Sequence, residues 1–74
     1  MGITLKALRI NAGLTQKEAA MVLKITPETL GSWERGETFP TVPQITKLEQ
    51  LYNTKYADII FIPNNIGLTD VAEG

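Results

Sequence analysis

Residues 15–36, TQKEAAMVLKITPETLGSWERG, decide the fold of this chain. The first four letters have the form of a capping box, in which the Thr15 hydroxyl accepts from the Glu18 amide and the Glu18 side chain reaches back. Pro27 follows a threonine suited to cap a helix, and its missing N–H would have no partner in a first helical turn. Gly36 suits the left-handed end of a helix. The pattern predicts two helices joined by a short turn, over about 16–23 and 27–35.

Apolar residues in this stretch recur at helical spacing. Ala19, Ala20 and Leu23 share one side of the first helix, and Leu30 and Trp33 share one side of the second. The small side chain of Ala20 would let the two helices approach where they cross. We therefore interpret Trp33 as a core residue rather than as one that stacks on a base. The opposite side of the second helix is polar or small and carries Glu28, Gly31, Ser32 and Arg35.

Outside this stretch, residues that typically begin or end helices predict further helices. Thr4 can cap a helix over about 5–12, which Gly13 would end. A fourth helix is expected over about 43–52 and a short fifth element over about 55–61, although β-branched residues leave a strand open at 59–62. The expected fold is all-α, a compact domain of four or five helices over 1–62, followed by a short flexible tail over 63–74.

Composition excludes several classes of function. The chain has 74 residues and neither cysteine nor histidine, so it fits one small domain without a disulfide framework, a Cys/His metal site or a Cys- or His-based nucleophile. Its longest apolar run, 59–62, is too short to cross a bilayer, and its N-terminus does not have the form of a signal peptide. We expect a cytoplasmic domain that is not an enzyme and that uses no cofactor, metal or membrane.

The charge of the chain is unevenly distributed. The formal net charge of −1 does not favour a nucleic-acid partner by itself. Residues 1–36 hold five basic and three acidic side chains, a net +2, whereas residues 37–74 hold two basic and five acidic ones, a net −3. This asymmetry suits a chain of which one part meets an anion, and it also suits a chance distribution.

Residues 5–61 resemble the lambda-repressor-like helix-turn-helix family, the Cro and phage-repressor type also called XRE-like. The resemblance is carried by the order of Gln16, Ala20, Leu30 and Glu34, followed at once by Arg35 and Gly36, with Arg9 upstream. It implies a sequence-specific transcriptional regulator of the phage or mobile-element repressor type. Such a protein would act as a homodimer on double-stranded DNA, with a recognition helix over about 27–35 in the major groove.

The resemblance also implies which residues meet DNA. Base contacts would come from Pro27, Glu28 and Ser32, with Thr26 and Thr29 nearby. Phosphate contacts would come from Gln16, Lys17, Arg35 and Thr38. These roles are chemically reasonable, because a carboxylate accepts from a cytosine amino group and a helix N-terminus favours a phosphate. For each residue the alternative is an ordinary solvated side chain.

Arg9 and Glu34 would form, by the same resemblance, a structural salt bridge between the helices expected over about 5–12 and 27–35. A phosphate contact is the alternative role of Arg9. The run 59–62 is a candidate dimer contact, and closing the core is its alternative role.

Some residues depart from the family pattern. Lys24 stands in the turn where the family usually has glycine or another residue that tolerates a positive φ. Gly31 lies within the recognition helix at a cost of about 1 kcal/mol relative to alanine. Near its tip the predicted recognition face lacks the Gln, Asn and Arg side chains that make bidentate contacts to bases, and the only charge there, Glu28, repels phosphate. A second hypothesis is therefore an antirepressor or accessory module that binds another regulator protein instead of an operator.

Overall fold

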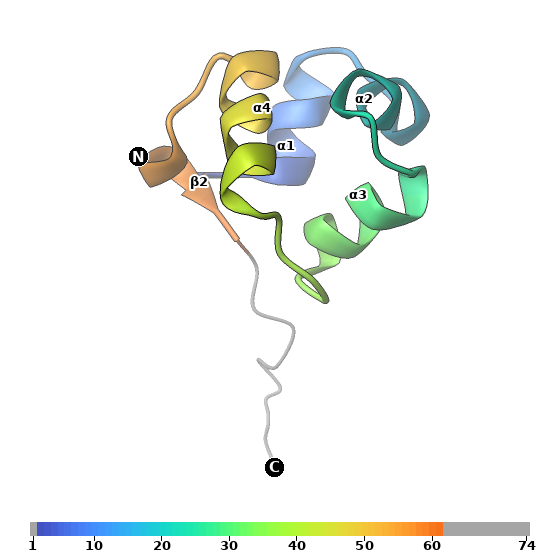
Figure 1. Cartoon of the computed structure of the whole chain (residues 1–74). Helices are drawn as coiled ribbons and strands as arrows, with labels where there is room; N and C mark the ends of the chain where they lie inside the picture. Colours follow the sequence, from blue (N-terminus) through green and yellow to red (C-terminus); the bar gives the residue numbers. More distant parts are fainter. Residues whose placement is uncertain (1, 62–74) are drawn as a thin grey trace, which may run out of the picture.

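A computed structural model describes residues 2–61 of the chain. Within this range four α-helices pack around one core, and two short strands lie beside them (Figure 1). The helices are α1 (Leu5–Asn11), α2 (Gln16–Leu23), α3 (Pro27–Arg35) and α4 (Val42–Tyr52). A 3₁₀ turn, η1 (Tyr56–Asp58), follows α4, and the strands are β1 (Ile3–Thr4) and β2 (Ile59–Ile60). The predicted lambda-repressor-like helical fold is confirmed, whereas the predicted tail over 63–74 lies outside the described residues.

Threonine hydroxyls begin the first three helices. The hydroxyls of Thr4, Thr15 and Thr26 each accept from the backbone amide three residues later, at 3.1–3.2 Å. The capping box of α2 is complete, because the Thr15 amide also donates to the Glu18 carboxylate at 2.9 Å. Because these capping signals are local in sequence, the observed helices begin within about a residue of the predicted positions.

The core is formed mainly where α2 packs against α3 and against α4. Leu30 and Leu48 are fully buried at its centre, and Ala19 and Ala20 are buried on α2. Trp33 is 3% exposed, which confirms that it is a core residue. None of the helices in the described range is long and apolar enough to span a membrane.

The short fifth element expected over about 55–61 is a 3₁₀ turn followed by a strand, which is the alternative left open for 59–62. The chain makes only the 3₁₀ turn there and then pairs β2 in parallel with β1, Ile3 opposite Ile59 and Thr4 opposite Ile60. Alternation along the strand buries Ile59 in the core and leaves Ile60 47% exposed. Ile59 therefore closes the core, and Ile62 lies outside the described residues.

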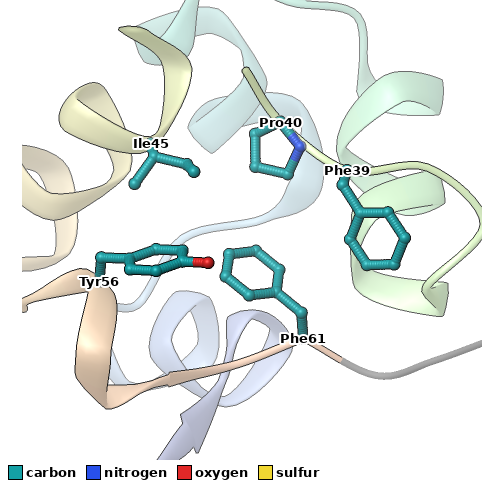
Figure 2. A pocket seen from close by; sticks show the side chains of 5 residues that line it. All are labelled: Phe39, Pro40, Ile45, Tyr56 and Phe61. Atoms are coloured by element: carbon teal, nitrogen blue, oxygen red, sulfur yellow. The ribbon is translucent and has the colours of Figure 1, made fainter. Parts of the chain in front are cut away.

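Aromatic side chains connect the segment after α3 to the segment after β2. Phe61 lies between Phe39 and Tyr56 (Figure 2), with ring centroids 6.2 and 5.8 Å away. Together with Pro40 and Ile45 these rings line an open apolar hollow of about 260 Å³. The packing holds the connector that leads away from the end of α3.

Candidate nucleic-acid interface

The side of α3 that faces away from the core carries polar side chains. Leu30 and Trp33 point inward, whereas Glu28 and Arg35 are exposed and Ser32 is half-buried. The first turn of α2 lies over the middle of this face, because a Cβ built on Gly31 would be 3.5 Å from the Gln16 side-chain nitrogen. Two helices therefore contribute to one polar surface.

The N-terminus of α3 is exposed to solvent. Thr26 and Pro27 are both exposed, and Pro27 occupies the first helical turn, where it is sterically favoured. The Thr26 and Thr29 hydroxyls lie 2.9 Å apart and share a hydrogen bond. Glu28 lies in this first turn, where the positive end of the helix dipole stabilises a carboxylate.

A buried ion pair ties α1 to the end of α3. Arg9 donates to both carboxylate oxygens of Glu34, from Nε at 2.8 Å and from Nη2 at 3.2 Å, and its Nη1 donates to the Leu14 carbonyl at 3.0 Å. The side chains are 11% and 4% exposed, and the bonds to Glu34 raise the pKa of Arg9. With every guanidinium nitrogen engaged inside the protein, this geometry favours a structural role for Arg9 over a phosphate contact.

Gln16 belongs to the same network. Its side-chain amide donates to Glu34 at 3.1 Å, so this carboxylate accepts from two side chains in addition to lying at the end of α3. The bond fixes the orientation of Gln16 at the N-terminus of α2, and the residue remains partly exposed. Lys17, the next residue, is exposed.

The C-terminal end of α3 holds two further side-chain pairs. Ser32 and Thr38 place their hydroxyl oxygens 2.8 Å apart. Arg35 donates to both carboxylate oxygens of Glu37, at 3.1 and 3.2 Å, in an exposed ion pair. Their hydrogen bonding raises the pKa of Arg35 and lowers that of Glu37.

Sequence reasoning placed Arg35 on this surface but did not include Glu37. The available signal was the Arg-Gly-Glu order, because a glycine that ends a helix turns the following residue back toward the last turn. Within residues 2–61, His, Cys, Asp and Glu side chains form no group of three or more that could hold a metal ion.

Comparison with known proteins agrees with this geometry. A helix-turn-helix family model matches residues 5–59, which include all four α-helices. The HTH-type transcriptional regulator ImmR of Bacillus subtilis (strain 168) is 43% identical over 53 residues. That match covers 72% of this chain and 42% of the relative, so the chain spans less than half of that regulator. The chain belongs to the Cro/C1-type helix-turn-helix family of DNA-binding domains.

Proposed function

We propose that this chain is the sequence-specific DNA-binding part of a transcriptional regulator, with α3 inserted in the major groove. The observation that carries the proposal is the division of α3 into two sides. Leu30 and Trp33 hold the helix in the core, so Glu28 and Ser32 are not required for packing. A helix held in this way can present its outer side to base edges.

The accessible N-terminus of α3 supports the base contacts. Glu28 can accept from a cytosine amino group, and Ser32 can donate or accept. The Pro27 ring and the Thr29 methyl group can contact a thymine methyl, with Thr26 beside them.

Phosphate contacts are proposed on both sides of these base contacts. Gln16 and Lys17 lie in the first turn of α2, where free backbone amides and the helix dipole favour an anion. Arg35 and Thr38 lie at the opposite end of the surface, at and after the last turn of α3. Phosphate contacts at both ends would fix the register of α3 in the groove.

We also propose that two copies act together. One domain of this size offers few base contacts, and two copies whose recognition helices are ~34–36 Å apart would double them on one side of the DNA. Phe39 and Tyr56 line the apolar hollow and are each more than half exposed (Figure 2). Val42, 76% exposed, lines an adjoining hollow that shares Ile45 and Tyr56, and contact with a second copy would cover all three exposed side chains. A role as a phage or mobile-element repressor in the cytoplasm rests on the family resemblance and is part of the proposal.

The second candidate is an antirepressor or accessory module that binds another regulator protein. It is favoured by the charge of the surface, because Glu28 is exposed and the Arg35 guanidinium is paired with Glu37. Such a module would retain little DNA even at low ionic strength.

Selection of bound sites from random duplex DNA at ~50 mM salt distinguishes the two functions. The proposal predicts an enriched palindrome and an affinity that falls ~10³–10⁵-fold between 50 and 200 mM salt if ~6–10 phosphates are contacted. No enriched sequence would contradict it and support the protein-binding module.

A matched pair of substitutions locates the contact surface. Lys17→Gln and Lys47→Gln each remove one exposed positive charge, but Lys47 lies on α4, beside the C-terminal end of α2 rather than at its first turn. We expect the slope of log K against log salt concentration to become shallower by about 0.9 for the first and to stay unchanged for the second. Equal changes would contradict the proposed orientation.

A further inference from the structure

The pair formed by Arg35 and Glu37 has the geometry of a bound oxyanion. The Nε and Nη2 groups of Arg35 each donate to one oxygen of the Glu37 carboxylate. A guanidinium binds a phosphate through the same parallel pair of bonds. The donors that a DNA phosphate would use are therefore occupied by a carboxylate of the same chain.

The backbone holds Glu37 in this position. Gly36 ends α3 with a φ of 79°, and the Glu37 amide donates to the Ser32 carbonyl at 2.9 Å. This closing bond turns the chain back against the last turn of the helix. The position of the Glu37 backbone is thus fixed by the helix end, and only its side chain is free to rotate.

The absence of a side chain at Gly31 leaves room for the Arg35 guanidinium on the side away from Glu37. A Cβ built on Gly31 would lie 3.0 Å from Arg35 Nη1, so the glycine lets the arginine lie close along the surface of α3. The pair remains open to solvent, with side chains 59% and 46% exposed. A phosphate approaching α3 can therefore reach it.

We propose that Glu37 is an intramolecular competitor for the phosphate contact of Arg35 and so limits the affinity of this domain for DNA. The inference rests on the proposed function. When a phosphate binds Arg35, the carboxylate has to leave the guanidinium and stays close to the DNA backbone, since its own backbone is fixed. Glu37 would lower the affinity for every duplex sequence alike, because a phosphate contact does not read bases.

This exchange has a distinctive dependence on salt. A free arginine that binds a phosphate releases cations condensed on the DNA. Here the guanidinium only changes partners, and the released carboxylate attracts a cation. The Arg35 contact should therefore add almost nothing to the salt dependence while Glu37 is present.

The test is a double-mutant cycle on the full chain with Glu37→Gln, Arg35→Gln and both changes, using the duplex enriched in the selection. Glu37→Gln is expected to tighten binding about 2- to 5-fold at 50 mM salt, the range of exposed ion pairs, and to steepen the salt slope by about 0.9. Arg35→Gln should change the slope little in the wild-type background and should abolish the added 0.9 in the Glu37→Gln background. The selected sequence should stay the same in all variants.

Asp58→Asn is the matched control, because it removes one negative charge in η1, which lies on the far side of α4 from α3 (Figure 1). An equal gain in this variant would overturn the inference, since the effect would then come from net charge. Binding with an unchanged slope in Glu37→Gln, or additive effects of the two substitutions, would also overturn it and leave the proposed function standing. Failure of every variant to bind duplex DNA would instead overturn the proposed function.

Discussion

Gly31 lies in the middle of α3, where glycine is intrinsically unfavourable. In the structure two polar side chains pack over it. The guanidinium of Arg35 and the amide of Gln16 both lie over its Cα. Neither contact involves backbone or core atoms, so a methyl group at position 31 would meet only flexible side-chain ends. The glycine therefore serves the polar surface rather than the packing of α3.

Gly31→Ala is expected to raise the free energy of unfolding by about 0.5–1 kcal/mol, because alanine has the higher helix propensity and the exposed Arg35 can move aside. Urea denaturation followed by circular dichroism measures the change. A loss of stability would show that Arg35 and Gln16 are held too firmly to move.

Tyr52 is a second residue whose environment is specific. Its ring is buried in the core, and its hydroxyl has no hydrogen-bond partner among residues 2–61. Burial, together with the nearby Glu34 carboxylate, raises the pKa of Tyr52 to about 12. The folded chain thus keeps the phenolic proton more tightly than the unfolded chain, whose tyrosine titrates near 10.

Two effects of Tyr52→Phe follow. Removing an unpaired buried hydroxyl should raise the free energy of unfolding by about 1 kcal/mol at neutral pH. Ionisation of the phenol is disfavoured in the folded state, so the free energy of unfolding of the wild type does not depend on this group below pH 10 and falls as pH rises from 10 through 12. Denaturation between pH 9 and 12 should show a steeper loss of stability in the wild type than in the variant, and parallel curves would contradict the assignment.

At the scale of elements, the turn between α2 and α3 sets the angle at which α3 is presented. Lys24 ends α2 in the left-handed conformation, with a φ of 60° and a ψ of 43°. This conformation costs a side-chain-bearing residue roughly 1–2 kcal/mol, and glycine adopts it without that cost. The turn keeps the shape typical of glycine although the residue is lysine.

Lys24→Gly should therefore raise the free energy of unfolding by about 0.5–1 kcal/mol, after the greater entropy of glycine in the unfolded chain is subtracted. Asn53 ends α4 in the same conformation, with a φ of 52°, and asparagine tolerates it better. Asn53→Gly is thus the control, and its melting temperature should rise by less than that of Lys24→Gly. A larger gain at Asn53 would contradict this explanation.

The elements also show what could be predicted from sequence. Helix starts could be predicted because the Thr15 and Thr26 hydroxyls accept hydrogen bonds from amides only three residues away. The pairing of β1 with β2 could not be predicted, because Ile3 and Ile59 are far apart in sequence and the packing of the helices between them brings them together.

The same distinction holds at the candidate site. The exposed side of α3 follows from helical spacing around Leu30 and Trp33. The partners of Arg35 and Ser32 depend on side-chain rotamers and on the path of the connector after Gly36. Local sequence patterns predict neither the rotamers nor this path.

At the scale of the whole molecule, pairing of two copies is tested at Val42, which lines the hollow adjoining the one between Phe39 and Tyr56. Val42 is 76% exposed and begins α4, where a carboxylate is favourable to the helix dipole. Val42→Glu should leave the fold intact and convert the protein from dimer to monomer, as measured by light scattering on a sizing column. An unchanged mass would place the dimer contact elsewhere, and a wild-type monomer would contradict the proposed pairing in solution.

The most direct test of the account is to repeat the selection from random duplex DNA with Glu28→Ala beside the wild type. If the outer side of α3 reads base edges, the preferred base should change at one or two positions in each half-site while the rest of the site is retained. An identical site bound more tightly would show that Glu28 only repels phosphate, and the absence of any enriched site for either protein would contradict the insertion of α3 in a DNA groove.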